Sequence, residues 1–133
     1  MSASHPNLTL INSFFKAYAD NDLEGINSVL DENIRWHIPG NHPLSGTKTG
    51  VTEVLAYFKE LNKGRFMAEP IVMGVNDHFV IDCHRNWSNL DSGENLKAMS
   101  CLLWRIESNK VVEVFNFPQD QHQVDAFFNR NFK

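Results

Sequence analysis

The second half of the chain contains four strand-like segments joined by short polar turns, and this pattern restricts the fold more than any other feature. The predicted strands span about residues 66–75, 78–89, 96–107 and 111–117. The turn signals between them are Asn76-Asp77, Asp91-Ser92-Gly93 and Ser108-Asn109. Connections this short join antiparallel neighbours, so the segments predict an antiparallel meander.

The first half is predicted to be mainly helical. The first helix carries an apolar stripe made of Leu8, Ile11, Phe15 and Tyr18. Asp22 is a candidate N-cap for a second helix, and a third helix spans about residues 50–62. Between these helices, residues 34–38 alternate as a short strand that ends at Pro39-Gly40, and a turn-rich loop covers residues 41–49.

A last helix is predicted after Pro118, with Val124, Phe127 and Phe128 on one face. Helices followed by a strand meander predict an α+β fold. We expect N-terminal helices packed on a strongly curved, mostly antiparallel sheet, which forms a conical half-barrel with an internal pocket. The length predicts a single domain, residues 1–133.

Charge and hydropathy argue against two classes of partner. The net charge is −4, with no cluster of Lys and Arg, so we expect no nucleic-acid partner. No apolar run approaches the roughly 20 residues of a membrane span, so we expect no membrane partner. The N-terminal residues lack the pattern of a signal peptide, and the expected location is therefore cytoplasmic.

The two cysteines, Cys83 and Cys101, lack the spacing of a zinc site or a redox motif. We predict two buried thiols. If the preceding turn centres near Ser92, the two residues lie opposite each other across a hairpin. A slip of one residue would pair Cys83 with Leu102 instead, and both registers remain open at this stage.

The strand over residues 78–89 alternates between two kinds of face. Its odd-numbered positions are Phe79, Ile81, Cys83, Arg85 and Trp87, and we predict that these form the buried face. Its even-numbered positions include Asp82, His84 and Asn86, which we predict to be the wetter face. Arg85 is then either a cation in the cavity or, if the register shifts, a residue exposed to solvent or to a dimer partner.

Three segments resemble the nuclear-transport-factor-2-like superfamily, and within it the branch of SnoaL-like polyketide cyclases and ketosteroid isomerases. They are residues 22–26 (DLEGI), 36–46 (WHIPGNHPLSG) and 112–121 (VEVFNFPQDQ). The resemblance covers nearly the whole chain. It implies the conical fold described above, a small-molecule pocket and a homodimer formed through the outer face of the sheet.

The resemblance also implies positions for catalytic groups. His37 lies where ketosteroid isomerases hold the carboxylate that moves the proton, and Asp120 lies where SnoaL-like cyclases hold an acidic base. The oxyanion-hole donors of the isomerases fall on Phe14 and near Leu102, and neither side chain donates a hydrogen bond. Steroid isomerisation is therefore disfavoured.

Two catalytic candidates follow, His37 and Asp120, each with a structural alternative. His37 is either a general acid–base or a histidine hydrogen-bonded to a loop carbonyl. Asp120 is either a base with a raised pKa or the cap of the last helix. The predicted substrate-binding residues, for which ordinary core packing is the alternative, are Phe14, Tyr18, Trp36, Tyr57, Phe58, Arg85, Trp87, Leu102, Trp104 and Phe117.

The leading functional hypothesis is a cofactor-independent isomerase or cyclase that acts on a small apolar carbonyl compound. We predict no cofactor and no metal, because His37, His42, His84 and Asp120 match no metal motif. One alternative is a non-catalytic small-molecule-binding module. A weaker alternative is an epoxide-opening hydrolase, in which Arg85 and Asp120 would supply two members of an Asp-Arg-Asp set.

Overall fold

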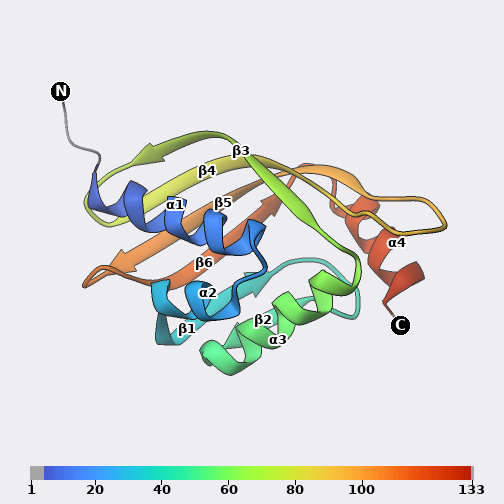
Figure 1. Cartoon of the computed structure of the whole chain (residues 1–133). Helices are drawn as coiled ribbons and strands as arrows, with labels where there is room; N and C mark the ends of the chain where they lie inside the picture. Colours follow the sequence, from blue (N-terminus) through green and yellow to red (C-terminus); the bar gives the residue numbers. More distant parts are fainter. Residues whose placement is uncertain (1–4, 133) are drawn as a thin grey trace.

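The computed structural model describes residues 5–132. Within this range the chain forms four helices and six strands (Figure 1). In chain order these are α1 (Pro6–Ala19), α2 (Leu23–Val29), β1 (Leu30–Ile38), β2 (Gly46–Thr49), α3 (Gly50–Lys63), β3 (Met67–Val75), β4 (Phe79–Trp87), β5 (Lys97–Glu107), β6 (Lys110–Pro118) and α4 (Gln121–Asn131).

The strands form one sheet in the order β2-β1-β6-β5-β4-β3. All neighbours are antiparallel except β1 and β6, which run parallel. The meander of β3 to β6 is therefore confirmed, and so is the α+β class of helices on a mostly antiparallel, open sheet (Figure 1). Strand β2 lies in the segment that was predicted to be a loop, where it pairs with the end of β1.

The helices begin and end where local chemistry predicts. Asp22 caps α2, since its Oδ1 accepts a hydrogen bond of 3.0 Å from the Gly25 amide. Gly64 ends α3, as expected from the sequence. In α1 the buried residues are Asn7, Leu10, Ile11, Phe14 and Ala17. No helix among residues 5–132 is long and apolar enough to cross a membrane.

The face assignment predicted for β4 is wrong. The even-numbered residues Val80, Asp82 and His84 are buried, whereas Ile81 and Arg85 are exposed. The physical reason is that the outer face of this sheet is also apolar, so the hydrophobic alternation of β4 does not identify the inner face. The even-numbered residues therefore face the helices, and the polar side chains among them belong to the interior.

A row of residues crosses the outer face of four strands in register. Val72 on β3 lies opposite Cys83, Cys83 lies opposite Cys101, and Cys101 lies opposite Phe117 on β6. The first of the two cysteine registers is thus the one that forms. Val72 and Phe117 are 63% and 55% exposed. The cysteines are free and half-buried, so the prediction of two buried thiols is wrong.

Aromatic side chains form the centre of the core. Trp104 is fully buried, and its ring lies 4.8 Å from Phe14 and 5.4 Å from Trp36, centroid to centroid. Phe58 contacts the rings of both Phe14 and Trp36. Tilted and edge-on contacts of this kind stabilise a core beyond simple burial. This cluster joins α1 and α3 to the inner face of the sheet.

Candidate functional site

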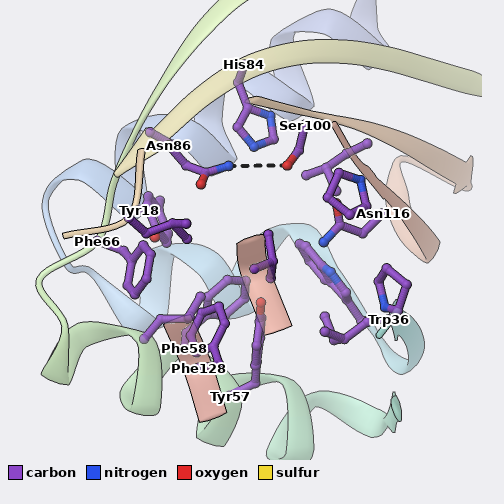
Figure 2. A pocket seen from close by; sticks show the side chains of 18 of the residues that line it. Tyr18, Trp36, Tyr57, Phe58, Phe66, His84, Asn86, Ser100, Asn116 and Phe128 are labelled. Carbon is purple, nitrogen blue, oxygen red and sulfur yellow. Dashed lines mark hydrogen bonds between the residues drawn. The ribbon is translucent and has the colours of Figure 1, made fainter. Parts of the chain in front are cut away.

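A pocket lies between the helices and the inner face of the sheet. It has a volume of about 110 Å³, which is several times the space of one water molecule. Its lower wall is aromatic, with Phe58 and Tyr57 from α3 and Phe128 from α4 (Figure 2). Its upper wall carries polar side chains from β4, β5 and β6. An apolar cavity with a few convergent polar groups is the usual form of a small-molecule site.

Six of the ten predicted binding residues line this pocket: Phe14, Tyr18, Trp36, Tyr57, Phe58 and Leu102. Four do not. Trp104 is buried in the core, where its indole donates a hydrogen bond to Asp82, the residue that pairs with His84. Arg85, Trp87 and Phe117 lie on the outer side of the sheet, as a consequence of the reversed strand faces. A role of the first six in binding remains a prediction.

His37 points away from the pocket. Its neighbours Trp36 and Ile38 line the cavity, and alternate residues of a strand face opposite sides. Its Nε2 lies 2.6 Å from Oε2 of Glu113, and its Nδ1 lies 2.9 Å from the Thr47 hydroxyl. The hydrogen bond from His37 is the main cause that lowers the pKa of Glu113; burial opposes it, and Arg35 and Arg105 reinforce it. His37 thus belongs to an ion-pair network on the outer face.

Asp120 is the N-cap of α4. Its backbone is extended, and its Oδ1 accepts a hydrogen bond of 3.1 Å from the Gln123 amide. The side chain is exposed and is not part of the pocket wall. His37 and Asp120 are therefore not brought together in the cavity, and the capping alternative for Asp120 is the geometry observed.

Removal of this cap gives a direct test of the role of Asp120. Asp120→Ala should lower the free energy of unfolding by about 1 kcal/mol, the usual value of an N-cap. The measurement is urea denaturation followed by circular dichroism. Asp22→Ala removes the equivalent cap of α2 and is the matched control, with a loss of similar size expected. A variant with unchanged stability but greatly reduced turnover would instead give Asp120 a chemical role.

His84 in the pocket wall forms a buried pair with Asp82 behind it, and the sequence interpretation placed both residues on the wrong face. Nδ1 of His84 lies 2.7 Å from Oδ2 of Asp82. The other carboxylate oxygen, Oδ1, accepts a hydrogen bond of 2.6 Å from the indole Nε1 of Trp104. Asp82 and His84 are 1% and 6% exposed. The two residues meet because positions i and i+2 of a strand share one face.

These contacts determine which nitrogen of His84 is free to act. An ionised Asp82 only accepts hydrogen bonds, so Nδ1 of a neutral His84 carries the proton. Nε2 is then left with an unshared electron pair. Figure 2 shows the His84 ring reaching from the upper wall into the pocket. The arrangement is that of a histidine base whose orientation and tautomer are set by a carboxylate.

Other polar groups surround this base. Asn86 donates a hydrogen bond of 3.3 Å to the Ser100 hydroxyl, which lies on the residue directly opposite His84 (Figure 2). Oδ1 of Asn116 is buried and has no hydrogen-bond partner among residues 5–132. A buried polar atom without a partner costs about 1–3 kcal/mol. A ligand that donates a hydrogen bond to Asn116 would remove this cost.

Two phenols line the pocket from the helices, Tyr18 from α1 and Tyr57 from α3. Burial raises the pKa of both hydroxyls, and the neighbouring Tyr18 raises that of Tyr57 further. Both therefore keep their protons at neutral pH and are available as hydrogen-bond donors. Phe14 and Leu102, which also line the pocket, have no such donor.

His42, in the loop after β1, also belongs to the pocket wall. Its ring stacks on Phe128 with centroids 4.8 Å apart, and its Nδ1 accepts a hydrogen bond from the Leu44 amide. Burial lowers its pKa, against the opposing charge of Asp125. A neutral His42 then carries its proton on Nε2, which has no partner among the described residues. His42 is thus a second buried donor.

In the part of the chain that the structure describes, the histidines and cysteines do not form a metal site. Within residues 5–132, no three side chains of His, Cys, Asp or Glu lie together in a way that would hold an ion. Both carboxylate oxygens of Asp82 are already hydrogen-bonded, one to His84 and the other to Trp104.

A family model described as a SnoaL-like domain matches residues 11–114. The chain belongs to the SnoaL-like family. The likeness to the nuclear-transport-factor-2-like superfamily inferred from the sequence is therefore confirmed. No curated protein sequence matches this SnoaL-like chain significantly.

Solved structures share the fold of this SnoaL-like chain over almost its whole length. Bal32a from a soil-derived mobile gene cassette has 23% identity and a TM-score of 0.87, covering 92% of this chain and 96% of its own. A protein of unknown function with a cystatin-like fold from Xanthomonas campestris has 30% identity and a TM-score of 0.82, covering 93% and 98%. TerC, co-crystallised with polyporic acid, has 17% identity and a TM-score of 0.83, covering 96% and 100%.

Proposed function

We propose that this SnoaL-like protein binds a small, mainly apolar carbonyl compound and catalyses a proton transfer on it, with His84 as the base. The observation that carries the proposal is that His84, which lines the pocket, is paired with the buried carboxylate of Asp82. The family supports a ligand-binding or isomerase/cyclase type of function. The crystallised complex of TerC with polyporic acid supports an organic ligand for this fold.

The chemistry follows from the groups around the cavity. Nε2 of His84 removes a proton from the carbon next to the carbonyl, and the electron pair of that C–H bond moves to the carbonyl oxygen as an enolate. Asp82 stabilises the imidazolium, and the phenols of Tyr18 and Tyr57 donate hydrogen bonds to the enolate oxygen. Return of the proton to another carbon completes an isomerisation, whereas attack of the enolate carbon on a second carbonyl closes a ring.

The experiment that tests this proposal measures proton exchange rather than one particular product. A panel of cyclic and aryl ketones is incubated with the protein in D₂O, and exchange of the protons next to the carbonyl is followed by ¹H NMR. The wild type should accelerate exchange for the ketones that it binds. Exchange that is equally fast with His84→Gln would contradict the role of His84.

A non-catalytic binding module is the second candidate, and one observation favours it. Nε2 of His42 and Oδ1 of Asn116 are buried and find no partner among residues 5–132, and both would gain hydrogen bonds from a ligand whether or not a reaction follows. Tight binding of ketones without any exchange would favour this function. An epoxide-opening hydrolase is not supported, because Arg85 is exposed on the outer face and cannot join an Asp-Arg-Asp set in the pocket.

We further propose that two copies associate through the outer face of the sheet. Asp82, His84 and Asn86, which were predicted to form the wetter face of β4, do not belong to this surface, since Asp82 and His84 are buried and all three side chains belong to the inner face. The outer face instead exposes apolar side chains, with Ile81 49% and Phe117 55% exposed. Apolar patches of this kind are typical of protein interfaces.

A solution measurement tests this association. Sedimentation at micromolar concentration should give the mass of a dimer for the wild type and of a monomer for Phe117→Asp, because the substitution places a charge in the apolar contact. Glu69→Asp, on the same strand β3 as Val72, keeps the charge of the face and is the control. A monomeric wild type would contradict the proposal.

A further inference from the structure

Two buried polar atoms in the pocket wall, which find no hydrogen-bond partner among residues 5–132, are of opposite kinds. Oδ1 of Asn116, on β6, is an acceptor. Nε2 of His42, in the loop after β1, is a donor, because Nδ1 of the neutral ring accepts from the Leu44 amide and the proton is therefore on Nε2. Buried polar atoms without a partner are rare in folded proteins, so a donor and an acceptor of this kind in one pocket indicate a bound group that completes both.

The donor is held in place by its surroundings. The ring of His42 stacks on Phe128, and its Nδ1 lies 3.1 Å from the nitrogen of the Leu44 amide. The Ser45 hydroxyl donates to the His42 carbonyl and accepts from the His42 amide, which fixes the backbone of the loop. A donor that is fixed before a ligand arrives loses little conformational freedom on binding.

The acceptor lies at the end of the pocket where β1 stops and the loop of His42 begins. His37 of β1 is the parallel partner of Phe115 of β6, so the next residues along the two strands, Ile38 and Asn116, are neighbours. Both Ile38 and Asn116 line the cavity. Figure 2 shows Asn116 across the cavity from Tyr18. The donor and the acceptor therefore belong to the same end of the pocket.

We propose that the ligand carries a neutral hydroxyl group that His42 and Asn116 bind, in addition to the carbonyl group that faces His84. A hydroxyl fits because it accepts through its oxygen and donates through its proton. A carboxylate only accepts, so Oδ1 of Asn116 would repel it, and an ammonium only donates, so the N–H of His42 would repel it. The proposal rests on the ligand pocket of the proposed function but not on the proton transfer.

The separation of the strands indicates the length of this ligand. His84 is on β4 and Asn116 is on β6, with β5 between them. Two strand spacings amount to roughly 10 Å, which is about the length of two fused six-membered rings with a polar group at each end. Phe58 and Phe128 on the lower wall cover a flat ring system of this kind (Figure 2). The ligand class is therefore a hydroxylated bicyclic ketone.

The test compares the affinities of 1-tetralone derivatives that carry a hydroxyl group at each free position of the aromatic ring. The matched fluoro-1-tetralones are the control, because fluorine is similar in size to a hydroxyl group but has no proton to donate. Dissociation constants are measured by isothermal titration calorimetry. For the wild type, at least one hydroxytetralone should bind about tenfold or more tightly than its fluoro analogue, because it completes both buried groups.

Three variants assign this preference to the two residues. His42→Asn keeps an oxygen that accepts from the Leu44 amide, since asparagine bonds the backbone two residues ahead, but it has no group in place of Nε2. His42→Phe keeps an aromatic ring on Phe128 without any donor, and Asn116→Leu keeps the shape of the side chain without the acceptor. Each variant should bind the fluoro analogue as the wild type does and lose most of the preference for the hydroxyl group.

Two results overturn the proposal. One is a wild type that binds no hydroxytetralone more tightly than its fluoro analogue, and the other is a preference that persists in all three variants. The proton transfer is judged separately, by the exchange assay in D₂O on the same compounds. A hydroxyl preference without exchange supports this inference and contradicts the role of His84 as a base, whereas exchange without a preference does the reverse.

Discussion

His84→Gln should reduce proton-exchange turnover by about 10²- to 10⁴-fold, the range that a positioned general base contributes. Glutamine has a similar length and keeps the side chain polar, but its amide does not accept a proton at neutral pH. The hydrogen bond to Asp82 can be made by the amide NH₂ group, so the fold should be retained. The comparison is made by the NMR exchange assay on the ketone that the wild type exchanges fastest.

The chain offers a matched control in His37→Gln. The same chemical change is made at a histidine that also pairs with a carboxylate, Glu113, but on the outer face of the sheet. Turnover should stay close to that of the wild type in this variant. If His37→Gln removes turnover and His84→Gln does not, the proton transfer does not take place in the pocket described here.

Ligand affinity separates a loss of chemistry from a loss of the pocket. His84 lies on the upper wall, whereas the aromatic lower wall belongs to α3 and α4 (Figure 2). His84→Gln should therefore bind the ketone within a few fold of the wild type, since the apolar burial that drives binding is unchanged. Reduced binding in proportion to the reduced turnover would indicate uniform binding rather than catalysis.

The architecture could be predicted from the sequence because it depends on local signals. The short turns at Asn76-Asp77 and Ser108-Asn109 each join two strands, and strands joined by so short a connection must be antiparallel neighbours. The cap at Asp22 acts within one helical turn and needs no knowledge of the rest of the chain. The conical arrangement of the sheet was predicted from the resemblance of three segments to the superfamily, and the structure and the family match confirm it.

The candidate site could not be predicted in the same way, because one face of a strand was mistaken for the other. Periodicity shows that two faces differ but not which of them is covered. In β4 the outer residues Phe79 and Ile81 are the more hydrophobic ones, since this face of the sheet is apolar as well. The inner face instead carries Asp82 and His84, whose burial depends on hydrogen bonds that only the fold brings together.

A signal for the correct site was nevertheless present in the sequence. Asp82, His84 and Asn86 place three polar groups on one face of an internal strand, directly after Val80. Polar side chains at successive inward positions are uncommon in a core unless they are paired. The likeness to isomerases and cyclases indicates His37 and Asp120 instead. In this chain His37 forms an ion pair on the outer face, and Asp120 caps a helix.

Trp104 connects the stability of the fold to the geometry of the site. Its indole is fully buried among the aromatic side chains of the core, and its Nε1 holds the carboxylate that orients His84. Removal of the ring therefore opens a cavity and frees one oxygen of Asp82 at the same time. Both effects act on the folded state, so they add to the same loss of stability.

Trp104→Ala should lower the free energy of unfolding by about 3–5 kcal/mol, the usual result of replacing a buried Trp or Phe with Ala. Domains of this kind are stable by about 5–15 kcal/mol, so the loss is a large share of the total. Urea denaturation followed by circular dichroism measures it. A decrease below about 1 kcal/mol would show that Trp104 is not the centre of the core.

Trp104→Phe is the matched variant, because it keeps an aromatic ring and removes the N–H donor. Its loss of stability should be about 1.5–3 kcal/mol, the contribution of a hydrogen bond to a charged group. Turnover should also fall in Trp104→Phe, since the Asp82 carboxylate that holds His84 then lacks the hydrogen bond from the indole. If stability falls while turnover is unchanged, Trp104 supports the core alone, and the orientation of His84 depends on Asp82 without help from the indole.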